Sequence, residues 1–202
     1  MKKIQKNLMF VVCLAVIFAA GSVFAAEKTD SFKDLQKQAQ KGDLNAMFFL
    51  GGKYFKGEEV KKNYKEAVKW WRKAAEKGHD DAQYNLAIAY ENGWGVKKNY
   101  DEAIKWYTKA ATNGLADAQY NLGISYVTGE GVEKNPSEAF KWWSKAAEQG
   151  HSQAQYNLGI LYYKGEGVEE NQELAVELWR KAAQNGHTGA QEALNKIGEK
   201  WE

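Results

Sequence analysis

Apolar residues recur along the chain with the spacing of an α-helix, and the pattern returns every 36 residues. Ala82, Leu86 and Tyr90 stand at i, i+4 and i+8, so one helix face carries all three. The register is kept at Ala46, Ala82, Ala118, Ala154 and Ala190, at Leu50, Leu86, Leu122, Leu158 and Leu194, and at Tyr54, Tyr90, Tyr126 and Tyr162. Four copies follow one another without an insertion, at 46–81, 82–117, 118–153 and 154–189. Self-similarity at this period is typical of helical repeat arrays.

Each copy predicts two helices. The first ends at glycines such as Gly93, because glycine adopts the positive φ that stops a helix. The second begins at an asparagine with a glutamate three residues later, as in Asn63 and Glu66, which indicates an N-cap with a capping-box partner. Neither helix pair can bury its apolar stripe alone, so the copies must stack. We therefore expect an all-α fold, an α-solenoid of helix pairs, with capping half-repeats in 26–45 and 190–202.

The first 25 residues have the features of an export signal. Lys2, Lys3 and Lys6 precede an apolar run over 8–20, and Ala25 ends a short stretch with small residues suited to a signal peptidase. The pattern predicts a cleaved signal peptide over 1–25 and a periplasmic or secreted bacterial protein without a stable membrane anchor. The alternative is an uncleaved anchor over 8–26, which is just long enough to span a bilayer.

Cleavage after Ala25 changes the charge and the available chemistry. It removes Cys13, the only cysteine, so the mature chain has no disulfide and no thiol nucleophile. It also removes three lysines, which lowers Lys+Arg from 28 to 25 against 26 Asp+Glu, and the net charge from +2 to −1. The basic balance therefore belongs to the signal, and we expect no nucleic-acid partner.

The repeat resembles a known family. Its residues Ala118-Gln119-Tyr120-Asn121-Leu122-Gly123, Gly129-Glu130-Gly131-Val132 and Trp142-Trp143 are similar to the Sel-one-like repeat, a relative of the tetratricopeptide repeat. The resemblance covers about 32–202 and recurs in register four times. It implies a right-handed superhelix of antiparallel helix pairs and a role as a scaffold or adaptor of protein complexes. An exported branch linked to β-lactam binding carries a cysteine pair per repeat, which 26–202 lacks.

The polar residues that recur do not combine into a catalytic or metal site. His79, His151 and His187 share one repeat position, and equivalent positions on packed helices lie about 8–10 Å apart or more, too far to hold one ion. Glu58, Glu130 and Glu166 share a loop position and are expected in solvent, and no serine has a lysine three residues later. We expect no enzyme, no cofactor, no catalytic residue and no metal.

The resemblance implies that the first helix of each copy lines the concave surface. This assigns a partner-binding face to the tyrosines, isoleucines and asparagines that recur there: Tyr84, Tyr120, Tyr156, Ile88, Ile124, Ile160, Asn85, Asn121 and Asn157. The asparagine amides would hold a peptide backbone. Identity in several copies is equally typical of packing between repeats, so both roles stay open for the tyrosines. Trp94 interrupts the loop acids, either as an exposed anchor for a partner or as a ring folded back on Tyr90.

These features together predict a monomeric, exported scaffold or adaptor that binds a protein partner on its concave face. Two alternatives remain open. One is an inhibitor or immunity-type protein that wraps a single toxic enzyme, and the other is an enzyme-like relative that binds cell-wall material or β-lactams. The sequence does not distinguish a periplasmic role from contact with a host, and it does not identify the partner.

Overall fold

The structure, a computed structural model, describes residues 31–201. The predicted signal peptide lies outside these residues. Within 31–201 the chain forms helices and no strand: α2 (Phe32–Gln40), α3 (Leu44–Lys56), α4 (Tyr64–Ala75), α5 (Asp80–Asn92), α6 (Tyr100–Thr112), α7 (Ala116–Thr128), α8 (Pro136–Glu148), α9 (Ser152–Lys164), α10 (Gln172–Gln184) and α11 (Thr188–Lys196). None of these helices is long and apolar enough to cross a membrane.

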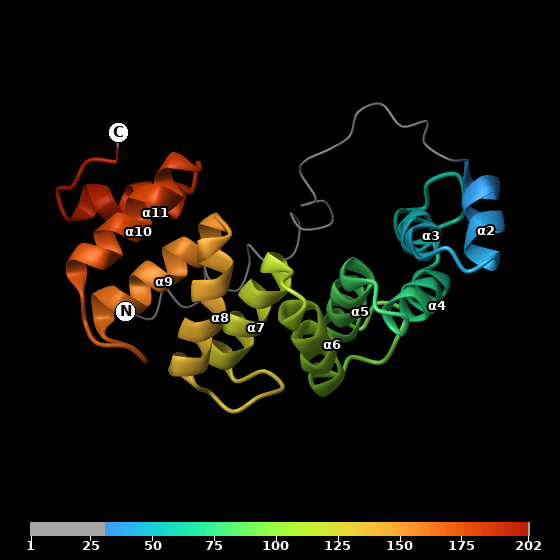
Figure 1. The fold of residues 1–202 in the computed structure, drawn as a ribbon, viewed down its shortest axis with the longest axis horizontal. Coiled ribbons are helices and arrows are strands. Elements are labelled where there is room, and N and C mark those ends of the chain that lie inside the picture. The colour runs from blue at the N-terminus through green and yellow to red at the C-terminus, as the bar shows by residue number, and fades with distance from the viewer. Residues whose placement is uncertain (1–30, 202) are drawn as a thin grey trace.

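The helices pack as pairs that stack in chain order. α3 packs on α4, α5 on α6, α7 on α8 and α9 on α10, and the second helix of each pair contacts the first helix of the next. The pairs follow an arc from α2 to α11, with α3, α5, α7 and α9 toward its inside and α4, α6, α8 and α10 toward its outside (Figure 1). The predicted all-α solenoid with a 36-residue repeat is therefore confirmed.

Half of the predicted capping box is wrong. Asn63 Oδ1 accepts from the Glu66 N–H at 3.2 Å, which confirms the N-cap. The reciprocal bond from the Asn63 N–H to Glu66 does not form, because that N–H donates to the Tyr54 carbonyl at 2.8 Å. The Glu66 carboxylate pairs with Lys69 instead. The same backbone bond joins Asn99 to Tyr90, Asn135 to Tyr126 and Asn171 to Tyr162, and so ties the two helices of each pair together.

Indole rings fill the space beside a glycine of the inner helix. Trp143 is 4% exposed, and its Nε1 donates to the Tyr120 carbonyl at 3.0 Å. A Cβ on Gly123 would lie well inside van der Waals contact with this ring. The same arrangement joins Gly51 to Trp71 and Gly159 to Trp179, where the Cβ would lie 2.5 Å from the indole nitrogen. In the second copy both partners change, to Ala87 and Tyr107.

Candidate protein-binding face

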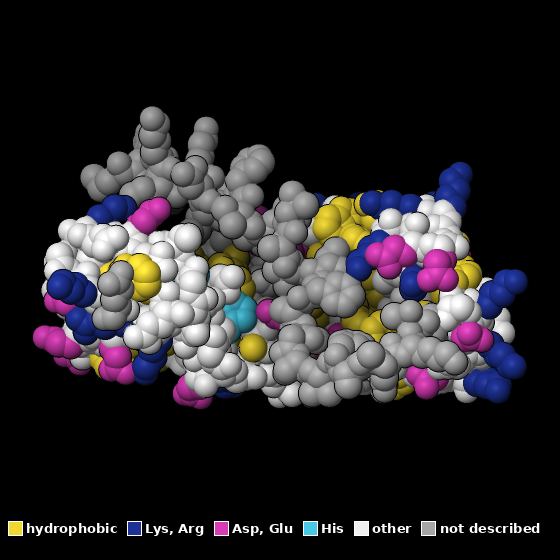
Figure 2. Space-filling model, turned by 90° about the horizontal axis from the view of Figure 1, so that it is seen from above, with side chains coloured by type: hydrophobic (Ala, Val, Ile, Leu, Met, Phe, Trp, Pro, Cys, Tyr) yellow, Lys and Arg dark blue, Asp and Glu magenta, His cyan; other side chains and the backbone are white. Residues whose placement is uncertain are grey.

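The inside of the arc carries partly exposed apolar side chains. In the view into the arc, hydrophobic atoms are visible on both sides of the middle, next to charged side chains (Figure 2). Ile88, Ile124 and Ile160 are half-buried at one repeat position, each packed against the core. Phe49 and Tyr163, on α3 and α9, are 40% and 37% exposed. These five residues, here called the inner row, are partly exposed apolar side chains on four successive inner helices.

Two of the recurring tyrosines stack on the histidine that caps the next inner helix. Tyr120 stacks on His151 with ring centroids 4.7 Å apart, and Tyr156 stacks on His187 at 4.5 Å. Burial raises the pKa of both phenols, and Tyr84, which is only 6% exposed, has its pKa raised by burial as well. All three tyrosines therefore contact the next helix pair, Tyr84 through its hydrogen bond with Asn121. Tyr120 and Tyr156 keep a partly exposed surface, so their contact with a partner stays a prediction, and Tyr84 is largely covered.

The asparagines are also engaged between repeats. Asn121 Nδ2 donates to the hydroxyls of Tyr84 and Tyr107, at 3.3 and 3.2 Å. Asn157 is 7% exposed and hydrogen-bonds Tyr120. In this arrangement the Nδ2 group of Asn121 is engaged by two tyrosines, so its contact with the backbone of a partner stays a prediction. Asn85 is half-buried on the first of these helices, where its role stays a prediction.

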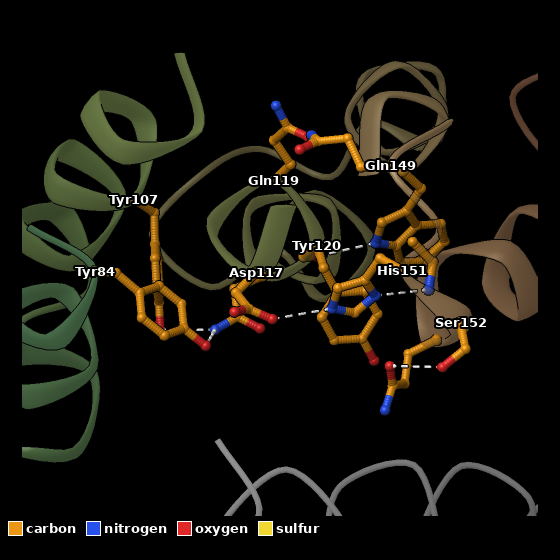
Figure 3. Close-up of polar contacts among 12 residues, drawn as sticks. Tyr84, Tyr107, Asp117, Gln119, Tyr120, Gln149, His151 and Ser152 are labelled. Carbon is orange, nitrogen blue, oxygen red and sulfur yellow. Dashed lines mark hydrogen bonds and ion pairs between the residues drawn. The ribbon is translucent and has the colours of Figure 1, made fainter. Parts of the chain in front are cut away.

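A polar network that the sequence analysis missed replaces the indole in the second copy. Tyr107 donates its hydroxyl to Glu91 Oε2 at 2.9 Å and accepts from Asn121 (Figure 3). Burial raises the pKa of Glu91, and the hydrogen bond from Tyr107 partly opposes that shift. The sequence did contain a signal for this network. Ala87, Glu91 and Tyr107 all differ from the other copies, which carry glycine, an apolar residue and tryptophan at these three positions.

The histidines act as N-caps of the inner helices. His151 Nδ1 accepts from the Ala154 N–H at 3.2 Å, and its Nε2 lies 3.2 Å from Asp117 Oδ1 (Figure 3). His79 and His187 cap α5 and α11 in the same way. Because one ring nitrogen accepts and the other donates, His151 has no ring nitrogen left to act as a base. Within 31–201 no group of three metal-ligating side chains comes together.

The cap at α11 should make local stability depend on pH. Burial lowers the pKa of His187, so its neutral form is favoured in the folded state, and the Nδ1 atom accepts from Ala190 only in that form. The contribution of the His187 cap to stability is therefore complete above the ordinary histidine pKa of about 6.5. It is lost as the pH falls from there through the lowered pKa of the folded state. Relative to His187→Asn, which keeps an uncharged cap, we expect the wild type to lose up to about 1 kcal/mol between pH 7.5 and 5. Urea denaturation across this range measures it, and parallel curves for the two proteins would contradict it.

Trp94 packs on the preceding repeat. Its ring centroid lies 5.1 Å from that of Phe55 and 6.1 Å from that of Tyr64. The ring therefore covers the joint between the first two copies, and the interpretation that it folds back on Tyr90 is replaced by these two contacts. It stays half-buried, so part of the indole faces solvent.

Comparison with known proteins gives the same architecture. A family model described as Sel1 repeat matches residues 44–79, 80–115, 116–151 and 152–187, in frames that begin two residues before the predicted boundaries. A protective antigen of uropathogenic Escherichia coli strains with an SLR fold is 39% identical, with a TM-score of 0.82 over 83% of this chain and 36% of that one. None of the curated proteins is a significant match.

Two further solved structures are similar. A Sel1 repeat protein from Oxalobacter formigenes is 37% identical, with a TM-score of 0.75 over 82% of this chain and 66% of that one. An immunity protein from Pseudomonas aeruginosa is 25% identical, with a TM-score of 0.51 over 79% of this chain and 58% of that one. The chain thus spans about a third of the Escherichia coli antigen, about two thirds of the Oxalobacter formigenes protein and somewhat more than half of the immunity protein.

The stacked helix pairs define this chain as an α-solenoid. It belongs to the Sel1 repeat family, whose repeat accounts for residues 44–187.

Proposed function

We propose that the protein is an exported, non-catalytic scaffold that binds a protein partner on the inner face of its arc. The observation that carries this proposal is the inner row, the partly exposed apolar side chains on α3, α5, α7 and α9. An amphipathic segment laid along the inside of the arc would bury these side chains. Export rests on the basic and apolar pattern of residues 1–25.

The binding face is tested by matched substitutions on the inside and the outside of the arc. Residues 26–202 serve as bait for envelope extracts, beside a variant with Ile88→Gln and Ile124→Gln. The control is Leu174→Gln, which alters a 38% exposed leucine on the outer helix α10. We expect the inner variant to lose at least about tenfold of the captured partner, since buried apolar contacts dominate such interfaces. Circular dichroism must show that all three baits keep their helix content. Equal capture by the inner variant and the parent would reject the inner face.

A second candidate is an immunity-type inhibitor that wraps one toxic enzyme. The observation that favours it is the similar fold of the Pseudomonas aeruginosa immunity protein. A tight one-to-one complex in size-exclusion chromatography with light scattering would support this function. A scaffold would instead retain several partners that compete for the inner row.

A further inference from the structure

One buried glutamine recurs in the repeat and was not identified from the sequence. Gln83, Gln119 and Gln155 are 4–5% exposed, and each Nε2 donates to a carbonyl at the end of the preceding outer helix. Each of these carbonyls also accepts from the backbone N–H of the glycine three residues later, so the glutamine supplies its second hydrogen bond. Each glutamine also buries its Oε1 acceptor, which needs a donor of its own.

In the third copy the chain supplies that donor itself. Gln149, just past the end of α8, donates its Nε2 to Gln119 Oε1 at 2.8 Å (Figure 3). The same nitrogen lies 3.4 Å from the Lys145 carbonyl. A primary carboxamide therefore fits this position and reaches two acceptors, one from the buried glutamine and one from the outer helix.

The second copy lacks the donor. Gln83 Oε1 is buried and has no hydrogen-bond partner among the described residues, and Gln155 Oε1 in the fourth copy is in the same state. The residues equivalent to Gln149 are Asn113 and Asn185, which are one methylene shorter. Asn113 is also held elsewhere, because its Nδ2 donates to Asp80 Oδ1 at 2.6 Å. For Gln149 the position equivalent to Asp80 is Ala116, so no carboxylate there draws its side chain away.

A cavity that is open to solvent lies beside Gln83 and Asn113. It has a volume of about 400 Å³ and is lined by residues of α4, α5 and α6, among them Ala75, Gln83, Thr108, Lys109 and Asn113. Because it lies beside the ends of two outer helices, this cavity is separate from the inner row. Gln83, whose Oε1 has no partner among the described residues, therefore lines a cavity with room for a side chain.

We propose that this cavity binds a primary carboxamide, the side chain of a glutamine or asparagine on a partner protein. The carboxamide nitrogen donates to Gln83 Oε1, as Gln149 does to Gln119, and the Lys109 carbonyl stands where the Lys145 carbonyl stands in the third copy. A carboxylate of the same shape carries no N–H and would set a negative oxygen against Gln83 Oε1, so the site should reject glutamate.

The test compares two short peptides that differ in one side chain. The probes are acetyl-Gly-Gln-Gly-N-methylamide and its Glu counterpart, capped so that the glutamine supplies the only primary carboxamide. Side-chain amide resonances of the protein are followed by NMR during titration. We expect saturable shifts at Gln83, with binding of the Glu peptide at least about tenfold weaker, as is typical when a buried acceptor loses its donor. Equal shifts with both peptides, or none with either, would mean that water alone fills the cavity and would overturn the proposal.

Two variants built from residues of the repeat itself test the result further. Asn113→Gln together with Asp80→Ala, which removes the acceptor that would draw the new side chain away, should close the cavity with the chain's own carboxamide and abolish the peptide shifts at Gln83. Gln149→Asn should open the third copy, so that Gln119 begins to respond to the Gln peptide. Each substitution introduces a residue that another copy carries at that position, so we expect folding to be preserved. Peptide shifts at Gln83 that survive in the Asp80→Ala, Asn113→Gln variant would also overturn the proposal, whatever the outcome for the inner row.

Discussion

Gly123→Ala is expected to destabilise the solenoid by about 2–3 kcal/mol, because the added methyl group overpacks a rigid part of the core. The Cβ would collide with the Trp143 indole, which is buried and held by its hydrogen bond to the Tyr120 carbonyl. The ring cannot retreat without losing that bond and its packing against the core. Urea denaturation followed by circular dichroism and by tryptophan fluorescence measures the effect. Agreement of the two probes is required, since repeat arrays do not always unfold in one step.

The second copy indicates which second substitution should restore part of the lost stability. Ala87 and Tyr107 occupy the positions of Gly123 and Trp143, so Trp143→Tyr should recover part of the stability lost in Gly123→Ala. Recovery should be incomplete, because Val127 stands where Glu91 accepts the tyrosine hydroxyl. A control is Gly52→Ala on α3, where a Cβ meets nothing within 4 Å. If Gly123→Ala were as mild as Gly52→Ala, or if the two core substitutions were simply additive, the glycine–indole contact would not limit this position.

The fold could be predicted because the start and the end of each helix are marked by residues that recur in every copy. Asn63 and its equivalents mark each outer helix, and Gly57, Gly93, Gly129 and Gly165 end each inner helix with positive φ. These are local signals, readable from neighbours in the sequence. The failure of the capping box has a non-local cause, since the N–H of each asparagine is taken by a carbonyl of the preceding helix.

The candidate site could be predicted only in outline. The inner helices and their isoleucines follow from the register, but the side chain that pairs with a given residue does not. Asn121 reaches Tyr84 across 37 residues, and Gln149 reaches Gln119 across 30. Whether a recurring polar residue binds a partner or joins two repeats is decided by such contacts. The substitutions at Ala87, Glu91 and Tyr107 in the second copy were visible in the sequence. Only the structure shows that the Tyr107 hydroxyl donates to the Glu91 carboxylate.

The second large loss of stability is expected when the hydrogen bonds among Tyr107, Glu91 and Asn121 are broken. Tyr107→Phe removes the hydroxyl that donates to Glu91 Oε2 and accepts from Asn121 Nδ2. Both partners then keep polar atoms in a partly or fully buried setting without that bond, which costs about 1–3 kcal/mol. The loss should exceed that of a surface Tyr→Phe substitution such as Tyr100→Phe, where the hydroxyl contacts the exposed Glu130.

The pH dependence of the destabilisation caused by Tyr107→Phe should identify Glu91 as the titrating group. Burial holds the pKa of Glu91 above its ordinary value in the folded state, so the folded protein binds a proton more readily and its stability falls as the pH rises through that range. The Tyr107 hydroxyl limits this penalty by lowering the pKa. Removing it should therefore destabilise the protein more at pH 7 than at pH 4.5. In a Glu91→Gln background the remaining cost of Tyr107→Phe should be independent of pH. A loss that depends equally on pH in both backgrounds would place the titrating group elsewhere and reject the role assigned to Glu91.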